Sequence, residues 1–141
     1  MIELTGALQT VAPGQDVLFN NAAVKSGCAE RWRGGSGQVV LTQPGRYLVT
    51  FSGNVAVPTG GTAGQVSLAI ALQGEAMYGS LMRATPAAVE EYFNISAQHY
   101  VDVPRVCCGG GACCQTVTIQ NTGAVAVSVD NANITAVRVC G

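Results

Sequence analysis

The residues best suited to chemistry are six cysteines. Four stand in a short glycine-rich segment: Cys107, Cys108, Cys113 and Cys114. The other two, Cys28 and Cys140, stand outside it. Thiolates with two to four residues between them can hold zinc, and Cys108 and Cys113 have that spacing. Adjacent cysteines point in divergent directions, however, so four thiols cannot easily face one ion. The pattern favours disulfides and predicts no metal and no cofactor. Reduced, buried cysteines and a metal site shared among chains are the alternatives.

The single histidine, His99, stands on the apolar register of its segment with Ile95 and Val101. That position is typical of a packed core or interface histidine. No Gly-x-Ser-x-Gly or His-Glu-x-x-His motif accompanies it. The adjacent carboxylates Glu90 and Glu91 diverge on most backbones, whereas a glycosidase needs two carboxylates facing each other across a cleft. We therefore predict that the protein is not an enzyme.

Trp32 lies between two arginines, Arg31 and Arg33. An exposed indole there could stack on a sugar ring, with Tyr78 as a second aromatic contact. The alternative is that Trp32 anchors a sandwich core while the arginine stems lie along its surface.

The charge content excludes two classes of partner. Charged residues make up 11% of the chain, the net charge is -1, and Lys25 is the only lysine. Such a chain has no basic stripe for nucleic acid and little attraction for an anionic membrane. No uninterrupted apolar stretch approaches the roughly 18 residues of a membrane-spanning helix. The low charge also favours association with other protein surfaces.

The first residues, Met1–Gly6, lack a basic region followed by an apolar one, so we expect no classical secretory signal. Six cysteines are nevertheless unusual in a reducing cytosol. We therefore expect the protein to reach an oxidising environment by another route.

Hydrophobic residues alternate with polar or small ones along most of the chain, which predicts strands with one buried face. The clearest runs are 66–72, 93–103, 116–120 and 125–129. Glycine, proline and asparagine mark turns between them, including Asp130-Asn131. Only Arg83–Glu91 could hold a short helical turn. The 141 residues are expected to form one all-β domain, an antiparallel sandwich or barrel.

The segment Tyr47–Val57 is apolar on both faces. One face holds Tyr47, Val49, Phe51, Val55 and Val57, and the other places Leu48 and Ala56 among polar residues. A strand that is apolar on both faces is covered on both faces. We therefore expect a second copy of the chain to cover Leu48 and Ala56.

The order of these segments resembles a known family. A strand pair at Gly6–Thr10 and Asp16–Asn20 precedes the Trp32 segment and a strand at Gln38–Thr42. A Pro-Gly turn then leads into Gly45–Phe51, and Asn131–Val139 closes the chain. This resembles the C1q/tumour-necrosis-factor-like jelly roll, most closely its bacterial and phage versions, which include the heads of collagen-like spore-surface glycoproteins.

The resemblance implies a two-sheet antiparallel jelly roll of about ten strands, assembled as a tight homotrimer. Three strands would face the threefold axis: the one with Tyr47 and Phe51, Phe93–Val103, and the C-terminal strand. The candidate interface residues are therefore Tyr47, Leu48, Phe51, Ala56, Phe93 and His99. The 141 residues hold no Gly-x-y repeat, so we expect a domain without a collagen stalk.

The same resemblance implies that the cysteine-rich segment lies at the end that carries Cys140, with Cys28 away from it. Five thiols at one end is an odd number, which favours bonds between chains or a free thiol. We expect cross-links among protomers or to a neighbouring component of a particle.

These expectations favour a structural protein, a trimeric jelly roll on a phage virion as decoration or fibre protein, partnered by a capsid or fibre component. Lysis would then release it without a signal peptide. The alternatives are a spore-coat or bacterial surface-appendage head, and a carbohydrate-binding module that uses Trp32 and Tyr78.

Overall fold

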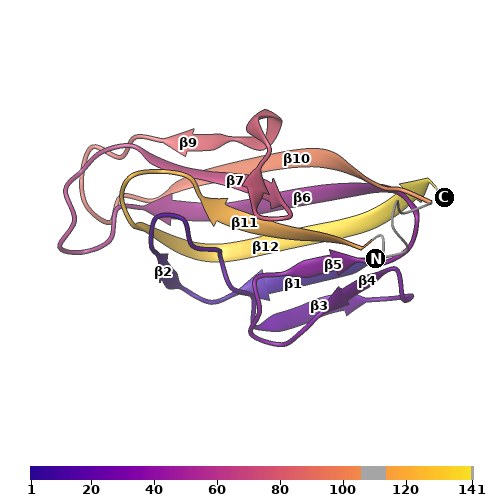
Figure 1. Ribbon diagram of the computed structural model, residues 1–141. Coiled ribbons are helices and arrows are strands. Elements are labelled where there is room, and N and C mark those ends of the chain that lie inside the picture. Colours follow the sequence, from indigo (N-terminus) through magenta and orange to yellow (C-terminus); the bar gives the residue numbers. More distant parts are fainter. Residues whose placement is uncertain (106–113, 141) are drawn as a thin grey trace.

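The computed structural model describes residues 1–105 and 114–140 as two antiparallel sheets packed face to face (Figure 1). Sheet A has the order β10-β6-β12-β1-β3, with β2 paired to β12; its strands are β1 (Ile2–Gly6), β2 (Gln9–Val11), β3 (Asn21–Lys25), β6 (Gly45–Ala56), β10 (Phe93–Val103) and β12 (Val127–Cys140). Sheet B has the order β4-β5-β11-β7-β8, with β9 paired to β7; its strands are β4 (Glu30–Trp32), β5 (Val39–Leu41), β7 (Val66–Leu72), β8 (Glu75–Ala76), β9 (Met82–Ala84) and β11 (Gln115–Asn121).

The prediction of an all-β antiparallel sandwich is confirmed. Two strands, β7 and β10, have the same bounds as the alternating runs 66–72 and 93–103. The described part of the chain forms twelve strands, slightly more than expected, because short pairings such as β2 and β8 leave little trace in the sequence. None of the helical structure in this part has the length and hydropathy of a membrane span.

The core lies between the two sheets and follows from the alternation. On β6 the buried side chains up to Val55 are those of one register, and Tyr47, Val49 and Phe51 have no exposed surface. Sheet B meets them with Leu41, Ile70 and Ile119, which are equally buried. Burying one such side chain contributes about 1.5–3 kcal/mol. The Tyr47 hydroxyl is satisfied because it donates to the Gln43 carbonyl oxygen at 2.7 Å.

The C-terminal strand is longer than expected. The sequence predicts a turn at Asp130-Asn131, but β12 runs unbroken from Val127 to Cys140. The pairing with β6 shifts between Asp130 and Asn133, and Asn131 has a φ of 54°. The turn signal therefore marks a β-bulge, in which asparagine tolerates the left-handed conformation.

The strand expected at Asp16–Asn20 does not form, because this segment makes no continuous ladder with a neighbouring strand. Val17 N–H donates to the Ile119 carbonyl, so this part of the chain borders sheet B. The Gln9 side chain stands in for a partner strand. Its amide donates to the Leu18 carbonyl at 2.8 Å, and its oxygen accepts from Leu18 N–H at 2.8 Å. A side chain thus makes the two bonds that strand pairing would provide.

The expected helical turn at Arg83–Glu91 does not form. Its first residues belong to β9, and a turn closes the segment, with Glu90 at a φ of 60°. The Glu91 carboxylate accepts from the backbone N–H groups of Ala87 and Ala88, at 3.2 Å each. The short helix η1 lies earlier, at Tyr78–Ser80.

Candidate interaction surface

The face of sheet A that points away from sheet B is mostly polar. On β6 this outward register is Leu48, Thr50, Ser52 and Asn54, all half-buried. Ala56 is fully buried within its own chain, so no second copy is needed to cover it. The expected second apolar face of Tyr47–Val57 is therefore wrong except at Leu48.

One apolar row nevertheless crosses the outward face near the end that carries the C-terminus. The strand register places Tyr100 of β10 beside Leu48 of β6, and Leu48 beside Val137 of β12. Tyr100 is 59% exposed, and the other two side chains are half-buried. We call these three residues the outward row.

An ion pair holds the aromatic end of the outward row. Arg46 donates to both carboxylate oxygens of Asp102, from Nε at 2.7 Å and from Nη2 at 2.9 Å. The Arg46 guanidinium lies 5.9 Å from the centroid of the Tyr100 ring, within reach of a cation–π contact. Hydrogen bonding to Arg46 lowers the pKa of the Asp102 carboxyl. Because both residues are exposed, the pair orients Tyr100 more than it stabilises the fold.

The residues predicted for an interface divide into two groups. Tyr47 and Phe51 lie in the core with no exposed surface, so their side chains cannot contact a partner. Phe93 is 41% exposed, and His99 is half-buried on the same edge strand, β10. His99 Nδ1 lies 2.7 Å from the Tyr100 carbonyl oxygen, which ties the imidazole to its own strand. With Leu48, these two residues remain the accessible members of the predicted set.

Sequence reasoning missed the rest of the outward row. A usable signal was present, because Tyr100 occupies the polar register of β10 among Ser96, Gln98 and Asp102. A large aromatic residue in an otherwise polar register is a better sign of a contact surface than one leucine.

The described cysteines gather around the turn between β5 and β6. Gln43 donates to the Cys28 sulfur at 3.3 Å, and Cys140 pairs with Arg46 at the start of β6. Cys114 directly precedes Gln115, which pairs with Leu41 at the end of β5. The expectation that Cys28 lies away from Cys140 is therefore wrong, because β4 returns to the same end of the sandwich as β12.

All three of these cysteines are unpaired in the described chain. The other three, Cys107, Cys108 and Cys113, lie outside the described residues. Within the described ranges no cluster of cysteine, histidine and carboxylate side chains could hold a metal. Cross-links between chains stay a prediction.

The two aromatic residues predicted to contact a glycan lie apart. Trp32 is on β4 at one edge of sheet B, and Tyr78 follows β8 at the other edge. Four strand spacings separate those edges, which is about 19 Å. Tyr78 is 86% exposed, whereas Trp32 is partly buried and packs against the core. One sugar ring cannot touch both residues.

The comparisons with known proteins identify the architecture. No protein-family model matches the chain, and no curated protein matches its sequence. Among solved structures, murine APRIL at pH 5.0 aligns with a TM-score of 0.64 and 10% identity, over 99% of this chain and 100% of that chain. Eiger TNF from S. frugiperda aligns with a TM-score of 0.68 and 11% identity, over 98% of this chain and 90% of that chain. The fold is a tumour-necrosis-factor-like jelly roll.

The jelly roll also occurs in a viral protein that resembles this chain. The PRD1 vertex protein P5 aligns with a TM-score of 0.54 and 17% identity, over 97% of this chain and 94% of that chain. Identities this low establish the shared fold alone.

Proposed function

We propose that the protein is a structural and interaction protein, a single jelly-roll domain spanning residues 1–141 that assembles as a homotrimer. The observation that carries this proposal is the outward row of Tyr100, Leu48 and Val137. The row leaves an aromatic side chain that is 59% exposed on an otherwise polar sheet, braced by the Arg46–Asp102 pair. Aromatic and arginine side chains are enriched where proteins meet.

Self-association is tested by multi-angle light scattering on the purified protein. We expect a mass three times the 14.4 kDa of one chain. Leu48→Arg should convert the trimer to a monomer, because it places a charge in the centre of the row. Leu8→Arg is the matched control, since Leu8 is 62% exposed on a different part of the surface. A monomeric wild-type protein, or equal loss of the trimer in both variants, would overturn the proposal.

We further propose that the trimer is displayed on a phage particle as a decoration or fibre protein, bound to a capsid or fibre component. The likeness to the PRD1 vertex protein P5 supports this setting through the fold. Immunogold electron microscopy of purified phage should show labelling at the particle surface. Labelling of spores or bacterial appendages instead would favour the alternative, a surface-appendage head domain. Either setting is extracellular, and in neither does the protein act as an enzyme.

The carbohydrate-binding alternative is not supported in its first form, because Trp32 and Tyr78 lie at opposite edges of sheet B. A different group of residues around Trp32 carries a separate inference, which follows.

A further inference from the structure

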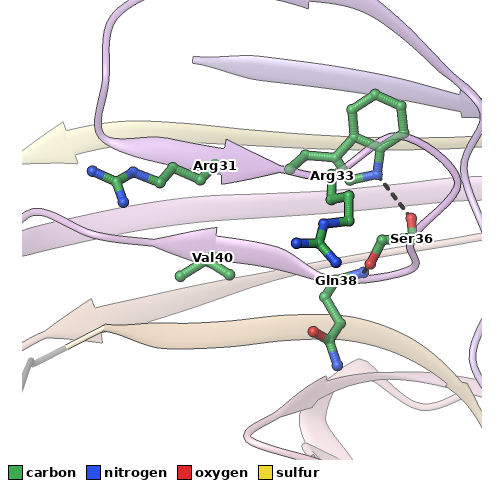
Figure 2. A pocket seen from close by; sticks show the side chains of 6 residues that line it. Arg31, Arg33, Ser36, Gln38 and Val40 are labelled. Carbon is green, nitrogen blue, oxygen red and sulfur yellow. Dashed lines mark hydrogen bonds between the residues drawn. The ribbon is translucent and has the colours of Figure 1, made fainter.

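A polar groove crosses the face of sheet B that points away from the core. It consists of two adjoining depressions, of about 360 and 440 Å³, which share Gln38. The first is lined by Arg31, Trp32, Arg33, Ser36, Gln38 and Val40, and the second by Asp16, Gln38, Gln73, Gly74, Thr116 and Thr118. We call this surface the sheet B groove. Figure 2 shows its arginine end, where Arg31, Arg33, Gln38 and Val40 gather over β4 and β5.

The strand register fixes the layout of the groove. Arg31 of β4 pairs with Val40 of β5, and Val40 pairs with Thr116 of β11. Thr116 lies beside Gln73, whose backbone N–H donates to the Thr116 carbonyl at 2.9 Å. The row from Arg31 to Gln73 therefore crosses three strand spacings, about 14 Å. That length suits a short oligosaccharide better than a single small ion.

The two ends of the groove differ in charge. Arg31 and Arg33 stand at one end, and neither forms an ion pair with a carboxylate of the described chain. The other end presents amide and hydroxyl groups with one carboxyl group, that of Asp16. Asp16 is half-buried at this end, and its burial raises the pKa of its carboxyl. The groove thus offers cationic donors at one end and, at the other, amide and hydroxyl groups beside one carboxyl group.

Several groups are held in place before any ligand binds. The Trp32 indole N–H donates to the Ser36 carbonyl at 2.8 Å, the bond drawn in Figure 2. The Ser36 hydroxyl in turn accepts from Gln38 N–H at 3.0 Å. The Gln73 side-chain oxygen accepts from Thr116 N–H at 2.8 Å, which leaves the Gln73 amide N–H₂ to donate. Fixed groups of this kind lower the entropy cost of binding.

Thr118 is the group that points most clearly to a ligand. Its side chain lines the groove and is 4% exposed, yet its hydroxyl oxygen completes no hydrogen bond with a described atom. The hydroxyl interacts with the Asp16 carboxyl and thereby lowers that carboxyl's pKa against the larger effect of burial, although the two groups fall short of full hydrogen-bond geometry. A buried hydroxyl without a partner costs stability, so a ligand hydroxyl that bonded to it would gain that energy back.

We propose that the sheet B groove binds a carboxylate-bearing oligosaccharide. Arg31 and Arg33 would pair with the carboxylate, and Val40, which lies beside Arg31 on the same face, would provide an apolar contact for the sugar ring. Gln38, Gln73 and Thr118 would bond to hydroxyl groups. A nucleic acid fits poorly, because two arginines neutralise few phosphates and the far end holds a carboxyl group.

The groove is independent of the proposed trimer contact. The outward row lies on sheet A and the groove on sheet B, so the two surfaces point in opposite directions from the sandwich. Failure of self-association would leave the groove accessible, and failure of sugar binding would leave the trimer unaffected.

The test is a ¹H–¹⁵N NMR titration of the full chain with four probes. Trigalacturonate and 3′-sialyllactose carry the carboxylate, and trigalacturonate methyl ester and lactose are their neutral counterparts. Both acidic probes should shift resonances of residues 31–40 and 115–118, with a Kd roughly tenfold or more below that of the neutral probes. Arg31→Gln and Arg33→Gln should each remove most of that difference. Arg83→Gln is the matched control, since it removes an exposed arginine on β9 outside the groove.

Thr118→Val separates binding from folding. The variant removes a hydroxyl whose contact with Asp16 falls short of a hydrogen bond, so it should fold about as stably as the wild type and yet bind all four probes several-fold more weakly. If sulfate shifts the same resonances with equal affinity, the groove holds an adventitious ion only and the proposal is overturned. The absence of saturable shifts with both acidic probes, or equal losses in Arg83→Gln, would also overturn the proposal.

Discussion

At the scale of single residues, Asp16 makes a testable contribution to the pH dependence of stability. Burial raises its pKa above the ordinary value of 3.8, so the folded chain binds this proton more tightly than the unfolded chain. The free energy of unfolding therefore falls as the pH rises from 3.8 through the raised pKa. Asp16→Asn should be more stable than the wild type at neutral pH. The difference should vanish below about pH 3.8, as measured by urea denaturation across that range.

Asp102 provides a control of opposite sign. Its pKa is lowered by hydrogen bonding to Arg46, so its small contribution to stability is present above the ordinary value and is lost as the pH falls through the lowered one. Asp102→Asn should be slightly less stable at neutral pH and equal to the wild type in strong acid. Parallel pH profiles for the two variants would contradict both assignments.

Asn121 predicts a larger effect, because its side chain is 1% exposed and fully bonded. Its amide donates to the carbonyls of Val11 and Val125 at 2.9 and 3.0 Å, and its oxygen accepts from Gly123 N–H at 2.9 Å. Asn121→Ala leaves these backbone groups without partners and should cost about 2–3 kcal/mol. Equilibrium urea denaturation measures the loss. The exposed Asn94→Ala should stay within about 0.5 kcal/mol of the wild type, and equal losses in both variants would contradict this reading.

Single-residue roles were only partly predictable from the sequence. The residue types at 31–33 left open whether Trp32 is a sugar contact or a core anchor. The groove residues Gln73 and Thr116 reach the arginines only through the pairing of β5 with β11. The Asn-Thr-Gly context of Asn121 is typical of a turn. The distant Val11 carbonyl that it satisfies is a tertiary contact, and no local pattern encodes such a contact.

At the scale of elements, the bulge in β12 depends on Asn131. This residue has a φ of 54°, and its side-chain oxygen accepts from the Asn54 amide at 3.0 Å. A β-branched side chain is strained in that conformation, so Asn131→Val should cost about 1–3 kcal/mol in urea denaturation. Asn131→Gly should stay within about 1 kcal/mol of the wild type, because glycine adopts positive φ readily. Equal losses in both variants would show that the side-chain contact, and not the backbone, is decisive.

Long alternating strands were predictable, and irregular ones were not. The runs 66–72 and 93–103 contain enough period-two pattern to give the bounds of β7 and β10. The bulge looked like a turn, because the same residue types serve both. The Asp16–Asn20 segment also alternates, but it meets β11 only at an isolated bridge, Asp16 with Gln120, and its Leu18 bonds to the Gln9 side chain. Side-chain pairing of this kind has no sequence signature.

At the scale of the whole molecule, topology brings distant residues to one end. The turn between β5 and β6 lies between β4 and β12, so Cys28 and Cys140 both border it although they are far apart in the sequence. The sequence predicted the sandwich and the order of its long strands. It did not predict which end Cys28 reaches, because that depends on the short pairing of β4 with β5.

The arrangement distinguishes the two cysteines in an assembly. Cys140 pairs with Arg46, in the row beside the outward row, and is exposed there. If the outward rows of different chains meet, Cys140 side chains approach one another, whereas Cys28 lies beside Gln43 at the edge of sheet B. Diamide, which removes two hydrogens from a thiol pair, should therefore produce covalent oligomers that persist in Cys28→Ser and disappear in Cys140→Ser. Non-reducing electrophoresis measures this outcome, and oligomers that survive in Cys140→Ser would show that the cross-link uses another cysteine.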